Sequence, residues 1–301
     1  MKKLWLYSFL LILVIPMTVF AQNDGGETIE PFYQSDFKVL LGDVQRPNGI
    51  YWHDGFLYTS CAGDWTLYRI WGETGETITY MFGIKNTHSL YVEDDESGGT
   101  DVWAVDFQDN KFVSINPGEN RGLYPIREGL AAPWGLTPSA TDDTFFITEW
   151  ESDNLINITR TGEITVVASG FSDPSGVVAT ADTIYLANNG SARRSLEWLD
   201  ITEGADINPQ PLVTGLQNVT NVVMGPDNLL YFTYALGTRG VVGRVDPVVC
   251  KENGGCTNVE VELVVWTDLA APLAGLVVTP EKRLYVHTMF GTEIYWLDLD
   301  R

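Results

Sequence analysis

The chain has 301 residues, with 18 lysines and arginines against 40 aspartates and glutamates, which gives a formal net charge of −22. Hydrophobic residues make up 45% of the chain and aromatic residues 12%, a composition typical of a folded globular protein rather than a disordered one. The acidic balance argues against a nucleic-acid binder, whose contact surface is basic, and against a protein that docks on anionic lipid.

Residues 1–21 predict a secretory signal peptide. Lys2 and Lys3 precede an apolar run from Leu4 to Phe20, and residues 19–21 offer small or apolar side chains at the offsets that signal peptidase requires. The run contains Pro16 and is shorter than the roughly 20 residues of a spanning helix. We therefore expect cleavage after residue 21, a secreted or periplasmic chain, and no membrane insertion after signal cleavage. The alternative is an uncleaved anchor.

One pattern recurs six times along the rest of the sequence. Each copy begins with Pro-x-Gly-apolar or a degenerate form of it, and a short strand with an aromatic residue follows. The six starts are residues 47–50, 87–90, 133–136, 174–177, 219–222 and 273–276. The aromatic residues of the second strands are Tyr58, Trp103, Phe146, Tyr185, Tyr231 and Tyr285. Short β-rich strands that repeat about every 45 residues, separated by Gly, Asp and Asn turns, predict the four-stranded blades of a propeller.

The two ends of the repeat region are expected to meet in one sheet. The last copy stops after its third strand, and residues 37–42 resemble in length and position the fourth strand at residues 164–169. The sequence therefore predicts an all-β, six-bladed β-propeller over residues 37–301, with residues 37–42 closing the last blade. Residues 22–36 are expected to be a flexible lead, and residues 247–258 an insertion loop in blade five.

Three cysteines allow one disulfide. Cys250 and Cys256 bracket a short polar loop, and in an oxidising compartment we expect them to pair. Cys61 is left over and is expected to be a buried thiol at a strand end.

The repeat resembles that of the NHL and SMP-30/gluconolactonase-like propellers, and the third copy is similar to the streptogramin-lyase type of repeat. The residues that carry the second likeness are 133–137, 146–150, 154–159 and 162–165. In propellers of this kind, the residue between the Pro and Gly positions projects toward the mouth of the central channel. That position is taken by Asn48, His88, Trp134, Ser175, Thr220 and Ala274.

This ring of unlike side chains is the main candidate ligand site, because it combines an amide, an imidazole, an indole and two hydroxyls. Asn188, which ends the second strand of blade four, is a further ligand-binding candidate. The alternative is that the ring lines the channel and holds no ligand.

A metal-dependent enzyme is the second hypothesis. Lactonases of the resembled type hold a divalent cation at the channel mouth, and Asn48 matches one of their ligand positions, whereas the other ring positions here carry no carboxylate. A streptogramin-lyase-like site would need a His and Glu pair, for which His88 and Glu149 are the candidates. Asp106 and Glu149 end second strands, where they could bind Ca²⁺ or act as acid–base groups, or could accept backbone N–H bonds from the adjoining loop.

From these alternatives we expect a binding module that holds a small molecule, a glycan or a protein segment at the channel mouth, and that is a monomer. The alternative function is a metal-dependent hydrolase or lyase of a cyclic ester, with catalytic candidates His88, Asp106 and Glu149 and metal candidates Asn48, Asp106 and Glu149. Its cofactor would be a divalent cation such as calcium.

Overall fold

The computed structural model describes residues 30–95, 97–116, 122–191 and 193–300. The expected signal peptide, residues 1–21, lies outside these ranges. Among the described residues, no helix has the length and the apolar character that crossing a membrane requires.

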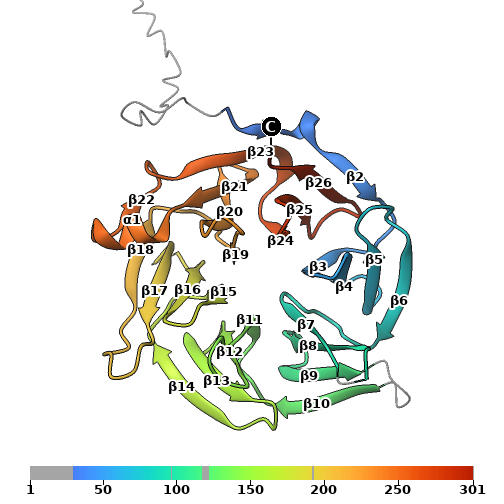
Figure 1. Cartoon of the computed structure of the whole chain (residues 1–301), viewed down its shortest axis with the longest axis horizontal. Coiled ribbons are helices and arrows are strands. Elements are labelled where there is room, and N and C mark those ends of the chain that lie inside the picture. Colours follow the sequence, from blue (N-terminus) through green and yellow to red (C-terminus); the bar gives the residue numbers. More distant parts are fainter. Residues whose placement is uncertain (1–29, 96, 117–121, 192, 301) are drawn as a thin grey trace, which may run out of the picture.

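Six sheets surround a central channel, as Figure 1 shows, and their pairing is antiparallel except at two short edge strands. The first three blades consist of β3 (Pro47–His53), β4 (Phe56–Cys61), β5 (Thr66–Trp71) and β6 (Thr77–Phe82); β7 (Leu90–Asp94), β8 (Thr100–Asp106), β9 (Lys111–Asn116) and β10 (Gly122–Glu128); and β11 (Pro133–Pro138), β12 (Thr144–Glu149), β13 (Asn154–Thr159) and β14 (Ile164–Ser169). In each blade the first strand is innermost, which confirms the predicted six-bladed β-propeller.

Blade four contains β15 (Pro174–Ala179), β16 (Thr183–Asn188), β17 (Ser195–Asp200) and β18 (Gln210–Thr214). Blade five contains β19 (Asn221–Met224), β20 (Leu230–Leu236), β21 (Arg239–Val245) and β23 (Glu262–Ala270). Blade six contains β24 (Leu273–Val278), β25 (Arg283–Thr288) and β26 (Ile294–Asp298), and β2 (Lys38–Leu41) pairs with β26. The N-terminal strand therefore closes the last blade, as predicted.

The expected flexible lead is wrong for its last residues. Phe32–Tyr33 form β1, which pairs in parallel with β23 of blade five, and Gln34–Asp36 form a 3₁₀ turn. The turn is held by the backbone N–H of Tyr33, which donates to Asp36 Oδ2 at 2.7 Å. The ordered chain therefore covers the outer edge of blade five before it enters blade six.

The insertion in blade five is a structured segment rather than a loop. It forms α1 (Pro247–Glu252) and β22 (Cys256–Thr257), and β22 pairs with β18 of blade four. Asp246 caps α1 by accepting the N–H groups of Val248 and Val249. The predicted disulfide between Cys250 and Cys256 joins α1 to β22, so the insertion ties blade five to blade four. Cys61 is buried, as expected, and its burial raises the pKa of the thiol to about 12.

The repeated aromatic residues hold the ring together. Each one packs against the next blade: Tyr58 against blade two, Trp103 against blade three, Phe146 against blade four, Tyr185 against blade five, Tyr231 against blade six and Tyr285 against blade one. The apolar core is therefore a closed series of six interfaces between blades rather than one central cluster. This arrangement leaves the inner strands free to line the channel.

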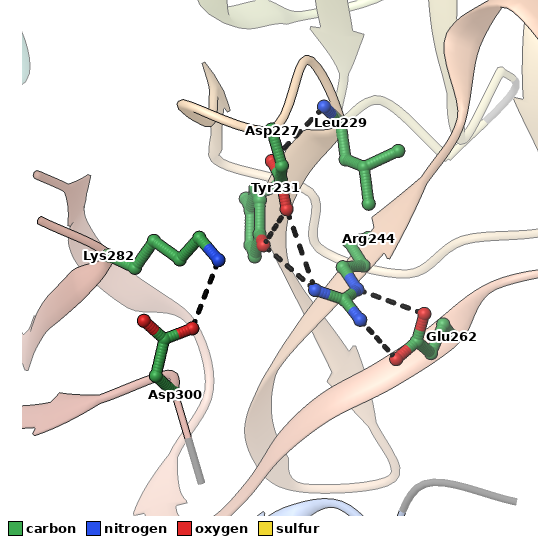
Figure 2. Close-up of polar contacts among 7 residues, drawn as sticks. All are labelled: Asp227, Leu229, Tyr231, Arg244, Glu262, Lys282 and Asp300. Atoms are coloured by element: carbon green, nitrogen blue, oxygen red, sulfur yellow. Dashed lines mark hydrogen bonds and ion pairs between the residues drawn. The ribbon is translucent and has the colours of Figure 1, made fainter. Parts of the chain in front are cut away.

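A polar network braces the outer strands of blade five. The Arg244 guanidinium donates to both carboxylate oxygens of Glu262, at 2.9 and 2.7 Å, and to the Tyr231 hydroxyl at 3.0 Å (Figure 2). The Tyr231 hydroxyl in turn donates to Asp227 at 2.8 Å. Burial raises the pKa of Tyr231 to about 12, so this hydroxyl keeps its proton. Lys282 and Asp300 form a separate, more exposed pair at 3.0 Å.

Candidate functional site

The Pro-x-Gly pattern exists because neighbouring inner strands approach each other closely around the channel. The N–H of Gly49 donates to the carbonyl of Thr87 in the next blade at 2.7 Å, and a Cβ on Gly49 would lie 2.9 Å from the same oxygen. The N–H of Gly176 donates to the carbonyl of Thr220 at 2.9 Å, again between blades. A side chain at the glycine position would force the blades apart. The residue before each glycine is thereby fixed at one end of the channel.

The expectation that this whole column faces the mouth is wrong for Ser175 and Thr220. Both side chains are buried, and their hydroxyls donate to carbonyls of the next blade, Ser175 to Val219 at 3.0 Å and Thr220 to Leu273 at 2.8 Å. In each case a small hydroxyl residue satisfies a carbonyl close to the start of the next blade. These two side chains hold the seams between blades together.

The carboxylates that end the second strands hold the adjoining loops in place. Asp106 accepts the N–H of Lys85 at 2.8 Å with one oxygen, and those of Gln108 and Asp109 at 3.1 and 3.0 Å with the other. Glu149 likewise accepts the N–H of Ala131 at 2.9 Å. Both carboxylates thus fasten the loops of their own blade by accepting backbone N–H bonds, which is one of the roles expected for them from the sequence.

Asn188 is also engaged in its own blade. Its side chain is fully buried, and its Oδ1 accepts the N–H of Ser172 at 3.0 Å. It lines neither of the two hollows described below.

These contacts do not fit a bound cation. Asn48, Asp106 and Glu149 come from three blades, and the two carboxylates already accept hydrogen bonds from backbone N–H groups and, for Glu149, from the Ser152 hydroxyl. Nowhere in the described ranges do three or more His, Cys, Asp or Glu side chains gather closely enough to hold a metal ion. A hard cation needs several converging oxygens, which these residues do not supply in this arrangement.

The structure does bring together two of the predicted residues, His88 and Trp134. Their rings stack face to face with centroids 3.5 Å apart and planes 6° apart. Trp150 stacks with Trp134 at 4.7 Å, and Phe107 meets both His88 and Trp134 edge-on. Burial lowers the pKa of His88 to about 3, so it packs as a neutral ring. Phe107, Trp134 and Trp150 stay partly exposed.

Trp150 and Phe107 were not among the sequence-predicted site residues, although a signal for them exists. They occupy the position at or directly after the end of the second strand, where the six blades carry Ala62, Phe107, Trp150, Asn189, Ala235 and Met289. This column faces the same end of the propeller as the Pro-x-Gly column, because the first and second strands are antiparallel. Two adjacent aromatic residues in a variable column indicate a specialised surface over blades two and three.

Two hollows adjoin this aromatic stack. A cavity of about 420 Å³ runs along the inner strands, with His88 and Trp134 at one end and Pro138 and Pro280 toward the other. A smaller pocket of about 170 Å³ opens at the mouth across blades six, one and two. It is lined by Arg46, Asn48, Ala62, Lys85, Asn86, Gln108 and Met289. The N–H of Phe107 donates to the carbonyl of Asn86 at 2.8 Å, which joins the stack to this pocket.

The fold and the mouth define a six-bladed β-propeller with an aromatic stack at one end of its channel. No family model matches the sequence, and no curated protein matches it. Solved structures do share its fold. A gluconolactonase from Xanthomonas campestris is 12% identical with a TM-score of 0.68, covering 87% of this chain and 89% of that one. The calcium-binding protein regucalcin from Agrobacterium tumefaciens is 11% identical with a TM-score of 0.65, covering 89% and 95%. A streptogramin B lyase is 14% identical with a TM-score of 0.60, covering 86% and 96%.

The likeness of fold to gluconolactonase-like and streptogramin-lyase propellers, expected from the repeat, is therefore confirmed. At these identities it concerns the architecture alone, and the function has to be argued from the site.

Proposed function

We propose that this chain is a binding propeller that holds a small molecule or a glycan at the channel mouth. The observation that carries the proposal is the aromatic stack of His88, Trp134 and Trp150, which is partly exposed and adjoins a polar pocket. A ring-shaped ligand with one apolar face would lie against the exposed parts of Trp134 and Trp150, while its polar rim would meet the amides of the pocket. Binding sites commonly combine such an apolar surface with a few placed polar groups.

The stack is rigid before any ligand arrives. Trp134 lies between the His88 ring and the Trp150 ring, and Phe107 fixes the edge of the group. Because these side chains contact one another, little rotamer freedom remains for a ligand to remove. A preformed surface of this kind favours binding of a rigid ring over capture of a flexible protein segment.

Trp134→Ala tests the proposal. We would screen the wild-type protein on a glycan array and a small-molecule thermal-shift panel, and then measure each hit by calorimetry. We expect Trp134→Ala and Trp150→Ala to weaken each hit at least about tenfold, the effect of losing about 1.4 kcal/mol of contact. Trp71, which is also partly exposed and contacts one aromatic ring, is the matched control away from the mouth. Hits that tolerate both mouth variants would contradict the proposal, as would hits confined to peptides.

The alternative function is a metal-dependent hydrolase or lyase of a cyclic ester, with calcium or another divalent cation at the mouth. One observation favours keeping it: Asn48 Oδ1 is buried and has no hydrogen-bond partner among the described residues. Asp106 and Glu149 would have to release their backbone N–H groups to join it. Turnover that a chelator abolishes would support this function over binding alone.

We also propose that the protein acts outside the cytoplasm, which residues 1–21 and the disulfide support. We propose further that it is a monomer. Cell fractionation followed by N-terminal sequencing should find the mature chain in the periplasm or the medium, beginning at residue 22. Light scattering should give the mass of one chain. Retention in the inner membrane with an intact N-terminus would favour the uncleaved anchor.

A further inference from the structure

The small pocket at the mouth has an unusual charge for this protein. Arg46 and Lys85 both line it, although acidic residues outnumber basic ones by more than two to one in the chain. Lys85 is paired with Asp109 at 2.7 Å, whereas Arg46 makes no ion pair with any residue in the described ranges. Of the other described arginines, Arg160, Arg193, Arg239, Arg244 and Arg283 pair with a carboxylate, and Arg69, Arg127 and Arg194 do not. The pocket therefore holds a guanidinium charge that the protein itself leaves unmatched.

The backbone conformation of Arg46 recurs in other blades, whereas its charged side chain does not. Arg46 has a φ of 57°, and the residues at the equivalent positions of blades three, four and five, Ala132, Asp173 and Asn218, have φ values of 52°, 48° and 48°. The left-handed turn is thus a repeated feature of the loop that enters a blade. The side chain at this position varies, and only blade one of these four carries a cation. The fold therefore fixes the position of residue 46, and its positive charge is particular to blade one among these four blades.

The pocket also contains an acceptor that lacks a donor. Asn48 is 1% exposed, and its Nδ2 donates to Asn86 Oδ1 at 2.5 Å. Its Oδ1 is buried with no hydrogen-bond partner in the structure. A buried acceptor without a donor is costly, so its presence in the wall of a pocket indicates a ligand that supplies an O–H or N–H group.

The wall around these groups is fixed in advance. Asp106 accepts the N–H groups of Lys85, Gln108 and Asp109, and the N–H of Ala62 donates to the Arg46 carbonyl at 3.0 Å. The volume of about 170 Å³ is several times the roughly 30 Å³ that a water molecule occupies in the liquid. The pocket therefore has room for a tetrahedral or planar oxyanion.

We propose that this pocket binds a small oxyanion that also carries a hydroxyl donor, such as hydrogen phosphate or a carboxylate with a hydroxyl beside it. Arg46 presents a forked set of N–H donors to the anionic oxygens. The hydroxyl of the ligand donates to Asn48 Oδ1. Sulfate and acetate fill the same kinds of space and accept from Arg46, but they have no proton to give to Asn48. The inference uses residues other than the aromatic stack, so it does not depend on the function proposed above.

Calorimetric titration of the mature protein at pH 7 and low ionic strength tests this, with phosphate, sulfate, glycolate and acetate as probes and sodium chloride as the ionic-strength control. We expect phosphate to bind at least about tenfold more tightly than sulfate, because an unpaired buried acceptor costs about 1–3 kcal/mol. Glycolate against acetate repeats the comparison with a carboxylate. The pair that shows the larger difference identifies the source of the oxyanion.

Three variants separate the contributions. Arg46→Gln should weaken phosphate at least about tenfold, whereas Arg127→Gln, which removes an exposed arginine from the outer strand of blade two, should leave it unchanged. Asn48→Asp should abolish phosphate binding, because it places a carboxylate beside the negatively charged ligand. Since Arg46 is exposed, its replacement leaves the core intact and keeps the test valid if Asn48→Asp fails to fold.

The outcomes also separate this inference from the function proposed above. Trp134→Ala should keep phosphate binding while it loses ring-shaped ligands. The pocket proposal is overturned if neither phosphate nor glycolate gives saturable heat beyond the chloride control, if sulfate equals phosphate and acetate equals glycolate, or if Arg46→Gln binds like the wild type. None of these results would alter the binding of glycans or small molecules to the aromatic stack.

Discussion

Two buried histidines should make the folded protein sensitive to mild acid. His88 lies in the aromatic stack, and His287 is fully buried between blade six and Ile50 of blade one. Burial lowers the pKa of each imidazole from 6.5 to about 3. An imidazole of the unfolded chain titrates at about 6.5. Between these pH values, unfolding takes up two protons, so the free energy of unfolding must fall as the pH is lowered.

The size of the effect follows from the unfolded pKa, because the folded imidazoles stay neutral throughout this window. At pH 5, each histidine lowers the free energy of unfolding by about 2 kcal/mol relative to pH 7.5, so the pair lowers it by about 4 kcal/mol. This loss is a large part of the roughly 5–15 kcal/mol by which domains are stable. The loss begins as the pH falls through about 6.5 and levels off near the folded pKa of about 3.

Urea titrations at pH 7.5 and pH 5 would measure it for the wild type, His88→Gln, His287→Gln and the double variant. Each substitution removes packing at both pH values, so the informative quantity is the difference between the two. We expect that difference to halve in each single variant and nearly vanish in the double variant, while carboxylates contribute equally to all four proteins. A double variant with the wild-type difference would show that these imidazoles are protonated in the folded state and refute the reasoning.

Three further predictions concern the scaffold and the cation. Arg244→Met should lower the free energy of unfolding by about 2 kcal/mol, because it leaves the Glu262 carboxylate and the Tyr231 hydroxyl without their donor. In the same urea titrations Lys282→Met, which breaks the exposed pair of Figure 2, should lower it by less than about 1 kcal/mol. Replacing Cys250 and Cys256 by alanine together should cost about 2 kcal/mol, the chain-entropy value for so short a loop, and equal stability of this variant and the wild type would refute it. Calcium added after EDTA should leave the melting temperature unchanged. A saturable rise of roughly 2–4 °C that Asn48→Ala removes would instead place a cation at the mouth.

The architecture was predictable because each blade repeats one local solution. The aromatic residue of every second strand packs on the next blade, so its recurrence in six copies indicates both the number of blades and their face-to-face packing. The closure by residues 37–42 was also predictable, because the last copy lacks a fourth strand and an unpaired edge is unfavourable. The pairing of β1 with blade five and of β22 with blade four was not predictable, since both strands have only two residues and carry no periodic pattern.

The sequence by itself determined the fold, the ring closure and the position in each repeat from which a side chain can approach the channel mouth. Only the tertiary structure decided which of those side chains remain available. The hydroxyls of Ser175 and Thr220 donate to carbonyls of the neighbouring blade, whereas Trp134 stacks with His88 and with Trp150. The physical reason is that a seam joins residues far apart in sequence, 44 for Ser175 and Val219, 53 for Thr220 and Leu273, and 213 for Tyr285 and Gly72. Whether a polar atom finds a partner is therefore set by the closed ring and not by the local repeat.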